Sequence, residues 1–283
     1  MRFGQFTVQV VSGGRLKMDG GTMFGVVPRA VWSRYVGPDA ENLVPMATNC
    51  LLVDTGRNRV LIDAGCGGKL TEKQRALLAV ESGSPLTDNL MSIGVAAADI
   101  DTVIMSHLHF DHAGGCTEFD AGGNLRPTFP RAAYVVQRGE WDLATADLPE
   151  LRGAYPQENI LPPRDAGCLR LIDGDVDIVP GIRSILTGGH SPAHQCLLIE
   201  SGGAAAVYLG DLCPTAHHLP VRWGTSYDLD VLQLRRKKSA LLAEIARHRW
   251  FAFFDHDPRV THARLRPDEK RDFTLDEESV PDG

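Results

Sequence analysis

Three histidines and one aspartate lie within six residues of the chain, as His107, His109, Asp111 and His112. A core position would require each side chain to be desolvated and paired, so ordinary burial does not explain the cluster. The preceding run 99–106 is predicted to be a buried strand and Ala-Gly-Gly follows the cluster, which places it on a loop at a strand end. Imidazole nitrogen and carboxylate oxygen suit zinc best, with iron, manganese or cobalt as alternatives. The segment therefore predicts a metal site.

Further candidate ligands occur downstream in the same kind of position. His190 follows the apolar run RSIL, Asp211 ends AAAVYLGD, and His256 comes directly after WFAFF. A single histidine or aspartate at a strand end is commonly structural. Three of them in addition to the first cluster supply enough donors for two metal ions.

The rest of the sequence alternates short apolar runs with turns rich in glycine and aspartate, which indicates an α/β fold of packed sheets flanked by helices. Neither a long linker nor a repeat of fixed period is found, so we expect a single domain over 1–274 and a polar, acidic tail over 275–283 that frays. Strands are predicted over 5–11, 48–56, 59–65, 99–106, 132–137 and 250–257 and as a ladder over 169–211, and helices over 70–81 and 232–248.

The composition indicates which classes of binding partner to expect and in which cellular compartment the protein works. With 29 basic and 36 acidic residues among 283, the formal charge is −7, which argues against a nucleic-acid partner. The six cysteines form no Cys-x-x-Cys pair and are expected to be reduced thiols. There is no signal-peptide pattern and no apolar run of about 18 residues or more. We expect a cytoplasmic protein that binds no membrane and acts on a small molecule.

The order of these motifs resembles that of the metallo-β-lactamase superfamily over residues 48–257. The resemblance implies a four-layer αββα sandwich of two mixed sheets, with the metal site at one edge. It also implies that Asp63, at the end of an early strand, supports the site from behind the ligands. The ligands that it implies are His107, His109 and His190 for one ion, Asp111, His112 and His256 for the other, and Asp211 as a bridge between them.

This arrangement is suited to hydrolysis. Two divalent ions about 3.5–4 Å apart can share a water, lower its pKa and polarise the carbonyl or phosphoryl group of a substrate. Asp111 and Asp211 are the expected catalytic carboxylates, and Asp211 is placed to accept the proton of the attacking water.

The N-terminal part, 1–47, is expected to hold a strand and an entrance segment. Residues 19–32, together with 210–218 and 254–258, resemble the N-acyl homoserine lactonase-like members of the superfamily. Met23, Phe24 and Trp32 would form an apolar wall for an acyl chain, with Tyr227 as a further substrate-binding residue if its loop folds back. Segments of this kind also form dimer contacts, so a homodimer is expected.

One position departs from that pattern. The well-known lactonases carry a tyrosine three residues after the bridging aspartate, where this chain has Pro214. The nearest polar replacements are His217 and His218, and we expect His218 to act as a general acid.

These features favour a dinuclear zinc hydrolase that opens a lactone or another ester, such as a lactonase of the quorum-quenching type. A phosphotriesterase or a thioester hydrolase of the glyoxalase II kind are alternatives on the same site. A mononuclear iron persulfide dioxygenase is a further alternative, but it would not need Asp111, His112 and His256.

Overall fold

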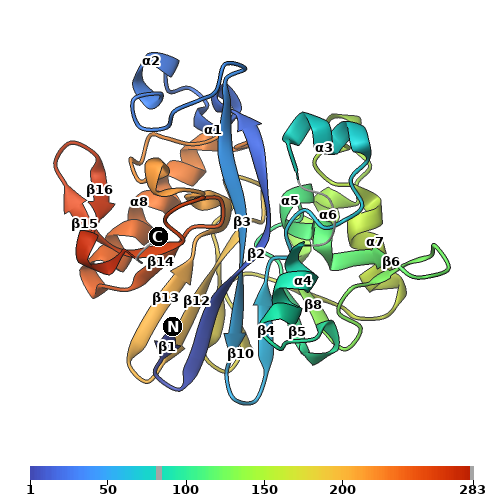
Figure 1. Ribbon diagram of the computed structural model, residues 1–283. Helices are drawn as coiled ribbons and strands as arrows, with labels where there is room; N and C mark the ends of the chain where they lie inside the picture. Colours follow the sequence, from blue (N-terminus) through green and yellow to red (C-terminus); the bar gives the residue numbers. More distant parts are fainter. Residues whose placement is uncertain (81–84, 281–283) are drawn as a thin grey trace.

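The computed structural model describes residues 1–80 and 85–280 and forms two seven-stranded sheets packed face to face (Figure 1). The first sheet has the order β1-β2-β3-β4-β5-β8-β9, and the second has the order β10 to β16 in sequence. The bounds in the first sheet are β1 Arg2–Phe3, β2 Phe6–Asp19, β3 Leu43–Asp54, β4 Arg59–Ile62, β5 Thr102–Ile104, β8 Ala133–Gln137 and β9 Leu169–Ile172. Those in the second are β10 Asp177–Val179, β11 Ile182–Leu186, β12 Gln195–Ser201, β13 Ala204–Tyr208, β14 Phe251–Phe253, β15 His262–Asp268 and β16 Asp272–Leu275.

Helices cover the outer face of each sheet, which confirms the predicted αββα sandwich. Helix α8 lies against the second sheet, whereas α4, α6 and α7 lie against the first (Figure 1). The bounds are α1 Gly20–Phe24, α2 Arg29–Trp32, α3 Glu72–Leu78, α4 Pro85–Ser92, α5 Phe110–Ala113, α6 Arg138–Ala144, α7 Gln157–Asp165 and α8 Val231–His248, with a small hairpin of β6 Thr117–Phe119 and β7 Leu125–Pro127. Among the described helices, none is both long and apolar enough to cross a membrane.

The core has separate layers that follow from the strand patterns. Strands β3 and β4 contribute near-continuous buried runs, because one face packs on the other sheet and the other face on helices. Helix α8 buries Leu234, Leu241 and Ile245 along one stripe against the second sheet, as its periodicity predicts. Its start is fixed by Asp230, whose carboxylate accepts a hydrogen bond from the Gln233 N–H at 2.9 Å.

The C-terminal part is more ordered than the predicted frayed tail. Leu275 closes β16, which pairs with β15, and Glu277–Ser279 forms a 3-10 turn. The Ser279 hydroxyl accepts a hydrogen bond from the Arg264 N–H at 2.7 Å, so the segment packs on the second sheet. The last three residues of the predicted tail, 281–283, and the end of the predicted helix 70–81 lie outside the described residues.

Candidate metal centre

The histidine cluster lies at the carboxyl end of β5, as its sequence context predicts. Strand β5 runs parallel to both of its neighbours, β4 and β8, so the loops after these strands meet at one edge of the sheet. His107 and His109 occupy the loop after β5, and Asp111 and His112 lie in the short helix α5. His107 and His112 are buried, whereas Asp111 is partly exposed.

The first of two donor groups consists of His107, His109, His190 and Asp211. His109 Nδ1 lies 2.9 Å from His107 Nε2 and 3.0 Å from His190 Nε2. Asp211 Oδ2 lies 2.9 Å from His190 Nε2 and 3.8 Å from His107 Nε2. His190 comes from the loop between β11 and β12, and Asp211 from the turn after β13.

The second donor group lies on the other side of Asp211 and contains His112 and His256. The two Nε2 atoms are 3.1 Å apart, and Asp211 Oδ1 lies 3.2 Å from His256 Nε2 and 3.7 Å from His112 Nε2. Asp111 is adjacent to this group. Its Oδ1 lies 3.9 Å from His112 Nε2, and its Oδ2 lies 3.6 Å from His256 Nε2. The same group includes Asp255, which had no predicted role.

In three of these histidines the opposite ring nitrogen is held by the surrounding protein, which fixes the direction of the lone pair. His112 Nδ1 lies 2.8 Å from Asp63 Oδ2, and His190 Nδ1 lies 2.9 Å from Asp228 Oδ1. His256 Nδ1 donates to the Ala47 carbonyl at 2.7 Å.

Asp63 holds more than one part of the site. Its backbone has a φ of 58°, a left-handed conformation that aspartate tolerates better than most residues. Its carboxylate accepts hydrogen bonds from the Ser106 N–H and hydroxyl, both at 2.7 Å, and from the Tyr208 hydroxyl at 3.0 Å. Together with the His112 contact, these bonds tie the loop after β5 to β13.

The electrostatics of the two groups differ from residue to residue. Burial, and then the neighbouring imidazoles, lower the pKa of His107 and His109 well below the usual range. Burial alone would lower the pKa of His190, but Asp211 and Asp228 raise it to about 10. Burial raises the pKa of Asp255 to about 8, although His256 and His112 act in the opposite direction.

The donor set fits a pair of metal ions. Three ring nitrogens converge on one point in the first group, with His109 Nδ1 2.9 Å from His107 Nε2 and 3.0 Å from His190 Nε2, as the lone pairs around a cation would. Buried Asp211 Oδ1 and both oxygens of Asp255 have no hydrogen-bond partner within residues 1–80 and 85–280. Buried polar atoms are nearly always paired, so these orphaned atoms indicate that cations belong between them.

A cavity of about 440 Å³ opens above both groups. His109, Asp111, Asp211 and His256 form its floor, and Tyr227, which is half exposed, forms part of its wall. Tyr227 thus lines the same cavity as the metal donors, and its role toward a substrate stays a prediction. The remaining lining residues are Met18, Met23, Phe110, Glu150, Leu151, Gly153, Ala154, Thr225, Ser226 and Leu229.

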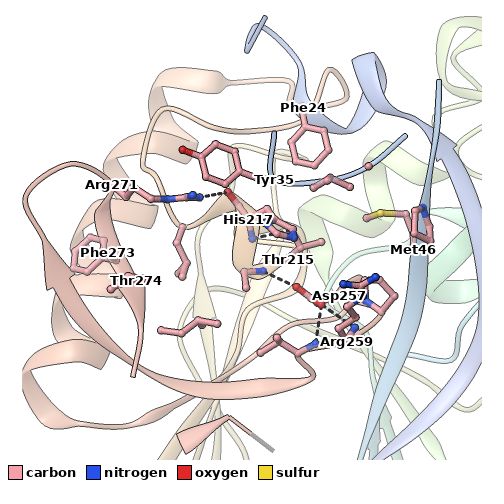
Figure 2. Close-up of a pocket in the computed structure, with 18 residues that line it drawn as sticks. Phe24, Tyr35, Met46, Thr215, His217, Asp257, Arg259, Arg271, Phe273 and Thr274 are labelled. Carbon is pink, nitrogen blue, oxygen red and sulfur yellow. Dashed lines mark hydrogen bonds between the residues drawn. The ribbon is translucent and has the colours of Figure 1, made fainter. Parts of the chain in front are cut away.

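The predicted apolar wall of Met23, Phe24 and Trp32 is only partly present in that cavity. Met23 lines it, but Phe24 turns away and stacks between the Trp32 ring and the His218 ring, with centroids 5.0 and 4.9 Å away. Phe24 faces a different cavity of about 460 Å³, shown in Figure 2, which is also lined by Tyr35, His217 and Arg271. Trp32 is buried and lines neither of these two cavities. Phe24 and Trp32 are therefore core residues of the entrance segment.

His218 does not occupy the position of a general acid. Its ring is fully buried and lines neither of these cavities. Nε2–H donates to the Met23 carbonyl at 2.8 Å, and Nδ1 accepts from the Thr215 hydroxyl at 2.8 Å. With both ring nitrogens engaged and no path to the cavity, His218 is a structural residue that anchors the entrance segment. The prediction of His218 as a general acid is thus corrected.

Two positioning residues were missed by the sequence analysis. Asp228 orients His190 from 38 residues away along the chain. Glu140 is buried and accepts hydrogen bonds from the Leu108 N–H at 3.0 Å and from the Ser191 hydroxyl, so it joins the two histidine-bearing loops. Neither residue is at a spacing that marks it as functional. Asp255 could have been noticed, because it directly precedes a predicted ligand at a strand end.

A family model for the metallo-beta-lactamase superfamily matches residues 43–256, which includes every donor described above. The chain belongs to the metallo-β-lactamase superfamily. Its sequence relatives include an N-acyl homoserine lactonase of Bacillus cereus, 30% identical over 232 residues, which cover 76% of this chain and 83% of that one. The chain is a lactonase-like metallo-hydrolase of this fold.

Solved structures agree with the assignment. A probable metal-dependent hydrolase from Staphylococcus aureus is 34% identical, with a TM-score of 0.89 over 98% of this chain and 99% of that one. A dizinc quorum-quenching lactonase, solved with its product N-hexanoyl-L-homoserine, has a TM-score of 0.80 at 22% identity and covers 100% of this chain and 96% of that one. At that identity, the second likeness concerns the fold alone.

Proposed function

We propose that the protein is a dinuclear zinc hydrolase that opens the ring of lactones carrying an acyl chain, in the manner of a quorum-quenching lactonase. The observation that carries the proposal is the pair of donor groups on the two oxygens of Asp211, at the floor of a cavity with apolar upper walls. The lactonase of Bacillus cereus supports the choice of substrate, and the three imidazoles of the first donor group support the choice of zinc.

The chain's residues would divide the work as follows. His107, His109 and His190 would hold one ion, Asp111, His112 and His256 the other, and Asp211 both. Such a pair of ions lowers the pKa of water and polarises the ester carbonyl. Asp111 and Asp211 reach the cavity floor, so their carboxylates can accept the proton that the attacking water releases.

The cavity also accounts for orientation of the substrate. Its floor is polar and charged, whereas Met18, Met23 and Leu229 offer an apolar wall for the acyl chain. Tyr227 lines this cavity and is next in the chain to Asp228, which is tied to His190; its hydroxyl would donate a hydrogen bond to the substrate. A volume of about 440 Å³ is within the usual range for a small-molecule site, about 300–1,000 Å³.

The proposal is tested by metal analysis combined with a substrate panel. We expect about two zinc ions per chain and the highest kcat/KM on an N-acyl homoserine lactone, compared with a phosphotriester and a thioester. Faster turnover of the phosphotriester or the thioester would transfer the function to that class. One iron per chain with oxygen uptake on a persulfide would reject hydrolysis altogether.

The apolar wall of the cavity leads to a prediction about the acyl-chain length of the substrate. Met23→Ala should raise KM for long-chain lactones about tenfold and leave kcat and short-chain substrates nearly unchanged, because it removes apolar contacts that ground and transition states share. Phe24→Ala is the matched control from the same helix. It should lower the melting temperature without altering the ratio of long-chain to short-chain KM, since Phe24 faces away from the cavity. Equal effects of both variants on that ratio would contradict the assignment of Met23 to the wall that contacts the acyl chain.

Compartment and assembly are part of the proposal. The six cysteines are all free, and five of them are buried, as expected of a protein from the reducing cytoplasm.

Val26, Val31 and Tyr35 expose apolar surface around the entrance segment, which favours a homodimer through this region. Sedimentation equilibrium of the wild type and of Val26→Asp would test the dimer.

A further inference from the structure

Asp255 is a buried carboxylate without a hydrogen-bond partner among the described residues. It is 1% exposed, and neither of its oxygens has a hydrogen bond within the described part of the chain. Burial of an unpaired carboxylate is costly, so such a group is ordinarily protonated or bound to a cation. Its neighbour Asp257 shows the usual alternative, because its carboxylate accepts hydrogen bonds from the backbone N–H groups of Ala216, Arg259 and Val260 at 2.8–3.0 Å.

The oxygens of Asp255 point at the second donor group. Asp255 Oδ2 lies 3.6 Å from His256 Nε2 and 3.9 Å from His112 Nε2. Asp111, the expected carboxylate ligand of that group, lies at the same two distances, 3.6 and 3.9 Å. Donor atoms around one zinc ion at about 2.0–2.1 Å are separated by about 3.3 Å, so both carboxylates need only small shifts to share an ion with the two imidazoles.

The two carboxylates approach from different sides. Asp111 lines the large cavity proposed for the substrate and also the small space beside Asp63 and Tyr208, whereas Asp255 lines that small space and not the large cavity. A ligand on the inner side would hold the ion without occupying the face that a substrate must reach.

We propose that Asp255 is an additional ligand of the second metal ion, which gives that site three carboxylates and two imidazoles. The inference rests on the proposed dinuclear centre and extends it. The first site has three imidazoles and shares only Asp211. The second site would have Asp111 and Asp255 besides the shared carboxylate.

This asymmetry has a chemical consequence. Imidazole-rich sites favour zinc, whereas oxygen donors also suit harder ions such as manganese. The second site of this chain should therefore retain Mn²⁺ better than the first. With Asp255, three negative carboxylates at the dinuclear centre face the four positive charges of two divalent ions, which lowers the cost of burying both ions.

The test compares metal affinity in the wild type, Asp255→Asn and the control Asp257→Asn by equilibrium competition with a chelator, for Zn²⁺ and Mn²⁺ separately. We expect Asp255→Asn to keep the first ion and to lose about 10- to 100-fold in affinity for the second, with the larger loss for Mn²⁺. Asp257→Asn should bind both ions within about threefold of the wild type, because its amide oxygen can still accept the hydrogen bonds from the Arg259 and Val260 N–H groups and only the Ala216 N–H loses its acceptor.

A second measurement does not depend on how the variants fold. In a crystal structure of the zinc-loaded wild type, an Asp255 oxygen should lie about 2.0–2.2 Å from the second ion. Two tightly bound ions in Asp255→Asn with unchanged affinities, or an Asp255 carboxylate outside bonding distance in the loaded structure, would overturn the inference alone. A wild type that binds fewer than two ions would instead overturn the proposed dinuclear function.

Discussion

Asp211→Ala is expected to lose both metal ions and to reduce kcat/KM by about 10⁴-fold or more, because it removes the carboxylate shared by the two donor groups. Asp211 Oδ2 faces His190 and Oδ1 faces His256, so one substitution takes a ligand from each proposed ion. The first site would be left with three neutral imidazoles and no negative charge to offset the ion. Metal content per chain should fall from two to below one, as measured by elemental analysis after dialysis.

A second variant, Asp228→Asn, distinguishes the loss of a metal ligand from the loss of the orientation of a ligand. Asp228→Asn removes the charge that orients His190 from behind without touching a proposed ion, and should cost about 10- to 100-fold in affinity for the first ion. Circular dichroism should show both variants folded. Two retained ions in Asp211→Ala, or more than a tenth of the wild-type activity, would show that Asp211 does not bridge a metal pair.

The predictable part of the site is the part that depends on local pattern. A β-branched run followed by clustered histidines places His107 and His112 at a strand end, because strands of one parallel set end at the same edge. His190, Asp211 and His256 follow from the same reasoning together with the family resemblance. Helix α8 was also predictable, since its apolar stripe is long and regular.

Other elements depend on contacts that no local pattern reveals. Helix α7 contains Pro162 and Pro163 and has little amphipathic character, so the sequence favours a loop there, whereas packing on the first sheet makes it helical. No strand was predicted after residue 257, because the hairpin of β15 and β16 carries many polar residues. Which way an aromatic side chain of the entrance segment points is likewise decided by its neighbours. Phe24 turns inward because the His218 and Trp32 rings form a stack for it.

His218→Phe is expected to be less stable than the wild type at pH 7.5, but as stable or more stable at pH 4.5. Burial, and then the nearby charges of Lys238 and His217, lower the pKa of His218 to about 3, whereas the hydrogen bond to the Met23 carbonyl acts in the opposite direction. An unfolded chain has a histidine pKa of about 6.5. The folded protein therefore binds fewer protons than the unfolded chain between these values.

The sign of the effect follows from this difference in proton binding. With a folded pKa below the unfolded one, the stabilising contribution of neutral His218 is complete above about pH 6.5 and is lost as the pH falls toward 3. At about 1.4 kcal/mol per pH unit, the loss between pH 6.5 and 4.5 is roughly 3 kcal/mol, a substantial share of a typical unfolding free energy of about 5–15 kcal/mol.

Phenylalanine keeps the stack on Phe24 but cannot be protonated. It leaves the Met23 carbonyl and the Thr215 hydroxyl without their partner, at a cost of about 1–3 kcal/mol at neutral pH. Urea unfolding of both proteins at pH 7.5, 5.5 and 4.5 measures the difference. Both should first be stripped of metal with a chelator, because protonation of the proposed metal ligands would otherwise add its own acid sensitivity. A difference in unfolding free energy that stays constant across these pH values would show that His218 does not gain a proton on unfolding in acid.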